Sequence, residues 1–104
     1  MKKVNTSIKG TISELRVEVD LLSRGYYVFR SESAGCPCDI IAMKEGRCFK
    51  IEIRTLKDKG QDKGIIPPHK IQEHEPGLIN WFAFVFWDEI IYYDMKTKHI
   101  FRPR

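Results

Sequence analysis

The sequence has no apolar run long enough to cross a membrane, and its first residues lack the apolar segment of a secretory signal. It also contains no internal repeat and no linker. The excess of positive charge is small, +4 over 104 residues, which permits a phosphate-bearing partner without requiring one. We therefore expect a single domain spanning residues 1–104, located in the cytoplasm and without a membrane partner.

Cysteine is scarce and odd in number, with only Cys36, Cys38 and Cys48. In a chain without a signal segment, an odd count argues against a disulfide framework. A zinc site that adds one histidine is an alternative, but the C-x-C spacing is shorter than the usual C-x₂₋₄-C and the histidines lie far along the chain. Buried or half-buried thiols that serve packing are the preferred interpretation.

A helix is predicted from about Ser7 to Ser23, because apolar residues recur there at three- and four-residue spacing: Ile8, Ile12, Leu15, Val19 and Leu22. That spacing places them on one stripe, which we expect to face the core. Val17 and Leu21 fall on a different flank, where they either touch a second subunit or are partly exposed. Glu14 lies near the angular sector of Leu21, at the border of the buried face, where a solvated glutamate is the usual finding.

Branched and aromatic residues predict strands at about 26–30, 39–43, 48–55, 81–87 and 90–94. The apolar crowding at 81–87 suits a central strand covered on both faces. A short second helix can begin at Pro67-Pro68 and run to about Glu75. This order predicts an α/β (α+β) domain, with a mixed central sheet of about five strands and the two helices on its faces.

The predicted strand at 48–55 alternates cleanly between two faces. Phe49, Ile51 and Ile53 point one way. Glu52 and Arg54 share the opposite face with Lys50.

Two carboxylates occupy neighbouring predicted strands, Asp39 at the start of one and Glu52 within the next. Mg²⁺ and Mn²⁺ prefer oxygen ligands, few of them from protein, so these two acids can hold such an ion if the strand register brings them together. Arg54 can then position a water or offset charge on a phosphate transition state. Glu14 can add a third carboxylate, directly or through water. The alternative is an exposed charge pair and a turn aspartate, each common on its own.

The segment 56–66 is charged, contains glycine and has no period. It predicts a loop that either touches a polyanion or simply lies in solvent, and both interpretations stay open. Backbone contacts to DNA need positive side chains around an acidic centre. The candidates are Lys57, Lys59, Lys63 and Lys70, with further basic residues in the tail after Met95.

Taken together, Glu14, the motif Gly35-x-x-x-Asp39-Ile-Ile-Ala and the motif Glu52-Ile-Arg54 resemble the pattern of the PD-(D/E)xK nuclease superfamily. The sequence is most similar to archaeal Holliday-junction resolvases and related small endonucleases. The resemblance covers residues 10–55 well, and the remainder only as an order of elements.

This resemblance implies a nuclease-like domain with a restriction-endonuclease-like core. It implies that Glu14, Asp39 and Glu52 bind Mg²⁺ or Mn²⁺ and that, with Arg54, they are the catalytic residues. It further implies a loop serine near DNA, for which the candidates are Ser31 and Ser33, and a polar residue of the second helix, for which Gln72 is the best match. The expected partner is DNA, including branched DNA. The resolvases are homodimers, which would suit an interface at Val17, Leu21 and the aromatic C-terminal strands.

One position departs from the family pattern, because Arg54 stands where the family has lysine. Lysine can change its pKa when buried, whereas arginine stays charged and cannot act as a general acid. Arginine can still orient a phosphate. We therefore predict that metal binding survives while cleavage is altered, slow or absent.

Three hypotheses follow from these residues. The first is a metal-dependent DNA endonuclease that hydrolyses phosphodiester bonds, selective for DNA structure in the manner of a resolvase. The second is a catalytically impaired DNA-binding module with a nuclease fold, and the third is a small structural domain without nucleic acid. The three acids favour the endonuclease over the impaired binding module. The lysines favour either of these DNA-binding functions over the structural domain.

Overall fold

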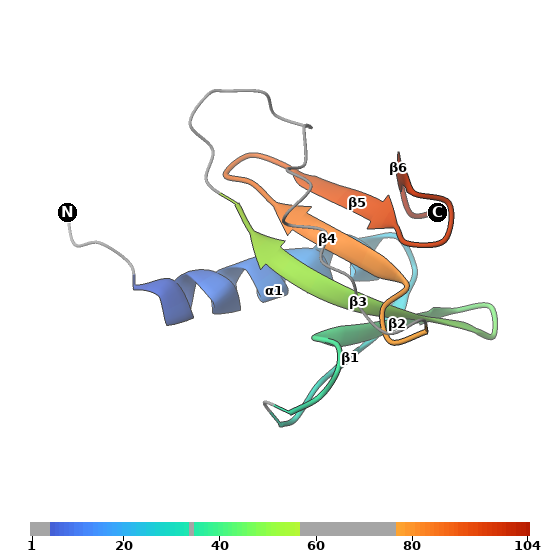
Figure 1. Ribbon diagram of the computed structural model, residues 1–104, viewed down its shortest axis with the longest axis horizontal. Helices are drawn as coiled ribbons and strands as arrows, with labels where there is room; N and C mark the ends of the chain where they lie inside the picture. Colours follow the sequence, from blue (N-terminus) through green and yellow to red (C-terminus); the bar gives the residue numbers. More distant parts are fainter. Residues whose placement is uncertain (1–4, 34, 57–76) are drawn as a thin grey trace.

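The computed structural model describes residues 5–33, 35–56 and 77–104, and the following statements concern those residues. The elements in chain order are α1 (Thr6–Ser23), β1 (Tyr27–Arg30), β2 (Ile40–Lys44), β3 (Arg47–Thr55), β4 (Trp81–Val85), β5 (Ile90–Asp94) and β6 (His99–Phe101). The expected α+β class is confirmed (Figure 1). The strand β6 was not expected, so the sheet has one strand more than the sequence predicted. The expected second helix falls outside the described residues.

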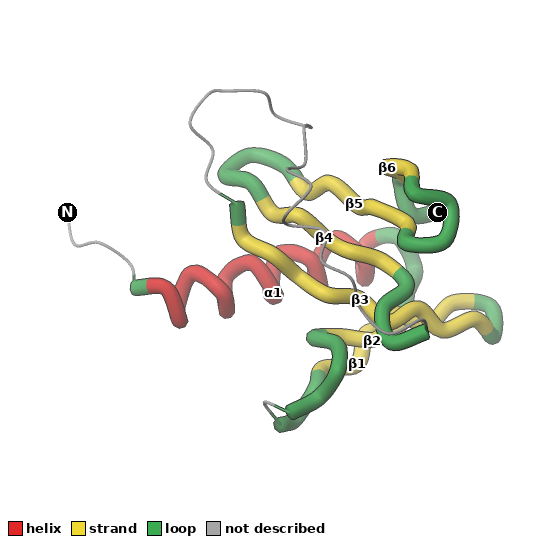
Figure 2. Tube along the Cα trace, in the orientation of Figure 1, coloured by secondary structure: helices red, strands yellow, loops and turns green. Residues whose placement is uncertain are grey.

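The six strands form one mixed sheet in the order β1-β2-β3-β4-β5-β6 (Figure 2). All neighbours are antiparallel except β3 and β4, which run parallel. The β2–β3 hairpin turns at Glu45 and Gly46, both with positive φ (53° and 78°), a conformation that glycine adopts without steric cost. The strand β3, which carries Glu52 and Arg54, therefore lies inside the sheet between a hairpin partner and a crossover partner.

Helix α1 lies against one face of the sheet (Figure 1). It begins after Asn5, whose side-chain oxygen accepts a hydrogen bond from the Ile8 amide at 2.9 Å, a normal N-cap. Toward the sheet the helix buries Ser13, Val17 and Leu21. None of the helices in the described part of the chain combines the length and apolar character needed to cross a membrane.

The predicted core stripe of α1 is wrong, because all five of its members are between 45% and 65% exposed: Ile8, Ile12, Leu15, Val19 and Leu22. Val17 and Leu21, expected on an outer flank or at a subunit contact, are fully buried against the sheet. Two apolar rows share the helical period, and the period alone does not say which one faces inward. The inward row begins at Ser13, whose hydroxyl lies 2.6 Å from the Thr55 hydroxyl at the end of β3. That polar contact joins the helix to the sheet along the less hydrophobic of the two rows, which hydrophobicity alone would not identify as the buried one.

Leu21→Ala is expected to lower the free energy of unfolding by about 2–5 kcal/mol, since a fully buried leucine leaves a cavity when truncated. Leu22→Ala is the matched control on the same helix, because Leu22 is 56% exposed. We expect the control to change stability by less than about 1 kcal/mol. Urea titration of both variants measures the difference. Equal losses would contradict the orientation of α1 described here.

A second apolar cluster covers the face of the sheet opposite α1: Cys38, Ile79, Phe82, Phe84, Phe86 and Ile91. Successive residues of β4 alternate between the two faces, with Trp81, Ala83 and Val85 in the cluster below α1. The rings of Phe82 and Phe84 stack at 5.4 Å between centroids. Every residue of β4 is buried, which confirms the expected central strand covered on both faces.

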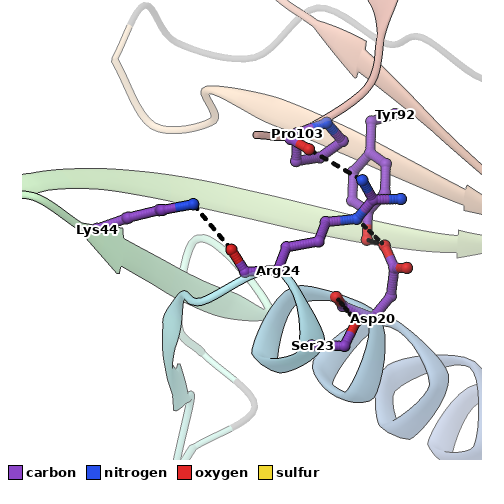
Figure 3. A network of polar contacts seen from close by, with 6 residues as sticks. All are labelled: Asp20, Ser23, Arg24, Lys44, Tyr92 and Pro103. Carbon is purple, nitrogen blue, oxygen red and sulfur yellow. Dashed lines mark hydrogen bonds and ion pairs between the residues drawn. The ribbon is translucent and has the colours of Figure 1, made fainter.

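A network of hydrogen bonds and an ion pair connects the C-terminal segment to the end of α1 (Figure 3). The Arg24 guanidinium donates to the Pro103 carbonyl at 2.9 Å and to the Asp20 carboxylate at 3.0 Å. Tyr92 on β5 donates its hydroxyl proton to the same carboxylate at 2.7 Å. Burial raises the pKa of Tyr92, and the charge of Asp20 raises it further, so the phenol stays protonated as a donor. Lys44 on β2 completes the network by donating to the Arg24 carbonyl.

Candidate functional site

Asp39 and Glu52 lie side by side at the open end of the β2–β3 hairpin. The last register pair of the two strands is Ile40 with Ile51, and Asp39 directly precedes it. The Asp39 amide donates to the Ile51 carbonyl at 3.0 Å, and the Asp39 carboxylate accepts from the Ile53 amide at 2.7 Å. Asp39 therefore forms hydrogen bonds with Ile51 and Ile53, the two residues that flank Glu52.

This arrangement arises because the chain leaves the sheet just before Asp39. The register of β2 with β3 ends at the pair Ile40–Ile51, so the ladder offers the Ile53 amide no backbone acceptor from β2. The Asp39 carboxylate takes the place of that acceptor. An unpaired, partly buried amide would cost about 1–3 kcal/mol, so Asp39 has a structural role in addition to any chemical one.

Glu14 approaches the same corner from α1. The neighbouring Ser13 is anchored to Thr55 at the end of β3, which holds this turn of the helix against the strand. The pKa of Glu14 is raised, first by partial burial and then by the negative charge of Asp39, while Arg30 opposes the shift. The charge of Asp39 thus acts on Glu14, although the two residues are 25 positions apart in the sequence.

Arg54 forms an ion pair with Glu52, with 2.5 Å between Nη1 and Oε2. The Glu52 side chain is 14% exposed and the Arg54 side chain 39% exposed, so the pair is partly shielded from solvent. The two residues share a face of β3, as the alternation of the sequence predicted. In this structure the guanidinium neutralises the carboxylate that the resemblance assigns to a metal.

Two charged residues at this corner were not singled out from the sequence. The Glu18 Oε2 lies 3.2 Å from the Arg30 Nε. The contact is an ion pair without hydrogen-bond alignment, because that buried oxygen has no hydrogen-bond donor. Glu18 follows Glu14 by four residues and so shares its side of the helix, a spacing that the sequence does contain. Arg30 is the last residue of β1. Its placement near Glu18 depends on the order of the strands in the sheet, which cannot be predicted from the sequence.

As the side chains stand, no three histidine, cysteine, aspartate or glutamate groups within residues 5–33, 35–56 and 77–104 are gathered closely enough to hold a metal ion. The donor types nevertheless fit a hard divalent cation, because Glu14, Asp39 and Glu52 supply only carboxylate oxygens. The repulsion between Glu14 and Asp39 is what a bound cation would relieve.

The remaining predicted site residues fall into two groups. Ser31 and Ser33 are exposed in the loop between β1 and β2, and the Ser33 hydroxyl lies 3.4 Å from the Cys36 thiol. That contact lowers the pKa of the exposed Cys36. The other group lies outside the described residues: Lys57, Lys59, Lys63, Lys70 and Gln72.

The cysteines are all free, as expected, but only Cys38 is buried. Cys36 and Cys48 are exposed, so the packing interpretation is wrong for these two. Both lie at a loop or hairpin end, where the chain turns away from the core.

Among solved structures, the fold is similar to that of the bacterial homing endonuclease I-Ssp6803I, with a TM-score of 0.69. The match covers 97% of this chain and 80% of that chain, at 11% sequence identity. No protein-family model matches the sequence, and no curated protein matches it either. At this identity the similarity establishes that the two chains share a fold.

Proposed function

We propose that this chain is a metal-dependent DNA endonuclease of the PD-(D/E)xK type, which hydrolyses phosphodiester bonds. One observation carries the proposal: Asp39 is bonded on both sides of Glu52, and Glu14 lies within the field of Asp39. Asp39, just before β2, is thus the acid that relates to both of the others, Glu52 on β3 through its bonds and Glu14 on α1 through its charge. The fold similarity to a protein named as a homing endonuclease supports DNA as the substrate.

Glu14, Asp39 and Glu52 would hold Mg²⁺ or Mn²⁺ at this corner. The ion would act as a Lewis acid, lowering the pKa of a bound water and neutralising charge on the scissile phosphate. Asp39 is oriented for this task by its bond from the Ile53 amide. Glu52 joins the set once its carboxylate turns away from Arg54.

Arg54 is then free to contact a phosphate oxygen and to offset charge that develops on it. It cannot donate a proton to the leaving group, since guanidinium keeps its proton at any working pH. Arg30 is half exposed beside Glu14 and offers a second cation for the phosphate. Ser31, Ser33 and the lysines of 57–70 are proposed DNA contacts. Preference for branched DNA and assembly as a homodimer are further proposals that rest on the family resemblance.

The second candidate is a DNA-binding module with impaired turnover. The Glu52–Arg54 ion pair favours it, because the pair keeps one proposed metal ligand neutralised. In that case DNA would bind with the salt dependence of phosphate contacts but would not be cut.

The first experiment is a cleavage assay on labelled duplex and four-way DNA with Mg²⁺, with Mn²⁺ and with a chelator. We expect metal-dependent nicking that the chelator abolishes, and tighter binding at 50 mM than at 200 mM salt, by about tenfold or more. Binding without nicking would select the impaired module. The absence of binding at low salt would exclude both functions.

A further inference from the structure

An open cavity of about 570 Å³ lies beside the C-terminal segment, a volume within the range of small-molecule sites. Its lining combines three aromatic residues with the segment that follows β6: Tyr26, Trp81, Phe101, Arg102, Pro103 and Arg104. None of these six is acidic, and two carry a positive charge. Glu14, Asp39 and Glu52 do not line the cavity, so it is distinct from the candidate metal site.

Aromatic rings form the floor of the cavity. Trp81 packs edge-on against Tyr26 and Phe101, with 6.0 Å and 4.8 Å between the ring centroids. Phe49 stacks on Trp81 at 4.3 Å. Trp81 and Tyr26 are only 5% and 6% exposed, so their rings are fixed by packing before any ligand arrives. A fixed aromatic surface is a favourable support for another planar ring.

Arg102 and Arg104 bring positive charge to the rim of the cavity, and both side chains are exposed. Their backbone is held in place from two sides. The Arg24 guanidinium donates to the Pro103 carbonyl at 2.9 Å, between the two rim arginines (Figure 3). The backbone of Arg104 is hydrogen-bonded to the Tyr26 hydroxyl. A backbone fixed in advance lowers the entropic cost of presenting the guanidinium groups to a ligand.

Two carboxylates act on this region, and each has a cationic neighbour. Asp20 accepts a hydrogen bond from Arg24. The charge of Glu45 reaches Tyr26, but the Lys44 ammonium lies 5.0 Å from the centre of the same ring. The charges of the rim arginines are therefore left over, and they favour an anionic ligand.

We propose that this cavity binds a nucleotide, with its base against the aromatic floor and its phosphate on Arg102 and Arg104. A guanidinium group matches two phosphate oxygens at once, and an aromatic surface accepts the face or edge of any base. A free nucleotide and an unpaired nucleotide of a strand share this chemistry. The proposal rests on the cavity and on no part of the proposed nuclease function.

Tryptophan fluorescence of a Trp87→Phe chain, in buffer with a chelator, tests the proposal. Trp87 is 84% exposed, and its replacement leaves Trp81 as the only tryptophan. The probes are adenosine monophosphate and a short single-stranded oligonucleotide, and the control ligands are adenosine and inorganic phosphate. We expect at least one probe to bind with a dissociation constant between about 10 µM and 1 mM. Both control ligands should bind at least about tenfold more weakly, and the tighter probe identifies the source of the nucleotide.

Three substitutions in that chain locate the binding. Arg102→Ala removes a charge-assisted hydrogen bond to the phosphate and should weaken binding at least about tenfold. Phe101→Leu keeps an apolar side chain but removes the ring, and should weaken binding about fivefold or more. Lys9→Ala is the matched control for the lost charge, because Lys9 is exposed near the start of α1, whereas Arg24 follows its last residue. It should bind nucleotide as the parent chain does.

Absence of binding by both probes, in fluorescence and in calorimetry, overturns the proposal. Inorganic phosphate that binds as tightly as the nucleotide overturns it as well, since the site would then recognise any anion. So does an equal loss in Lys9→Ala and Arg102→Ala. Circular dichroism melting checks that the variants fold, and Arg104→Ala replaces Arg102→Ala if the latter does not. The measurement contains no divalent metal and follows no cleavage, so a failed nucleotide site and a failed nuclease are distinguishable.

Discussion

Replacing Asp39 with asparagine is expected to lower metal-dependent cleavage by about 10²- to 10³-fold while leaving stability almost unchanged. Asparagine keeps a side-chain oxygen that can accept the 2.7 Å bond from the Ile53 amide. It removes the negative charge that a divalent cation needs. Initial cleavage rates with saturating Mg²⁺ or Mn²⁺, together with urea titration, measure both quantities.

The comparison with Asp39→Ala separates chemistry from structure. Alanine removes the acceptor as well as the charge, so it should also lower the free energy of unfolding by about 1–3 kcal/mol. The asparagine variant should therefore be inactive and stable, and the alanine variant inactive and destabilised. If Asp39→Asn cleaves as fast as the wild type, Asp39 serves only to close the end of the hairpin.

Arg54→Lys is expected to raise the cleavage rate by about 10-fold to 100-fold. The present guanidinium lies 2.5 Å from the Glu52 carboxylate. Lysine has a compact charge that competes less strongly for a bidentate carboxylate, and its ammonium can exchange a proton when its pKa is lowered. The measurement is the rate of nicking at fixed metal concentration, with the metal affinity followed by calorimetry.

Arg54→Gln is the matched control for this substitution. It frees Glu52 from its ion pair without supplying a new cation, so metal affinity should rise while cleavage does not. An Arg54→Lys variant that cuts more slowly than the wild type would show that the guanidinium itself is the working group. The impaired-module alternative would then lose its main support.

The local patterns of β3 and β4 were sufficient to predict much of the fold. The alternation that places Ile51 and Ile53 in the core and Glu52 and Arg54 on the other face is confirmed, because a strand offers only two faces. The burial of the whole of β4 is confirmed for the same kind of reason, since a run without polar residues must be covered on both faces. The strand β6 has three residues, too few for a period to appear.

The orientation of α1 was not predictable from its period, because the helix has two apolar rows and only the tertiary contacts select between them. The tertiary contacts that select the inward row are the Ser13–Thr55 contact and the burial of Val17 and Leu21. The same limit applies to the site. Asp39, Glu52 and Glu14 could be named as candidates from the sequence, whereas the contact of Glu18 with Arg30 depends on the packing of α1 beside β1.

The bond between Arg24 and Pro103 joins residues 79 positions apart. During synthesis, α1 and β1–β3 leave the ribosome long before Pro103 does, so the Asp20–Arg24–Tyr92 network cannot be completed while the chain is still growing. Contacts of this sequence separation form late and slow the folding of a domain. A nascent chain stalled before residue 103 should therefore expose the end of α1 and be digested faster by protease than the released chain.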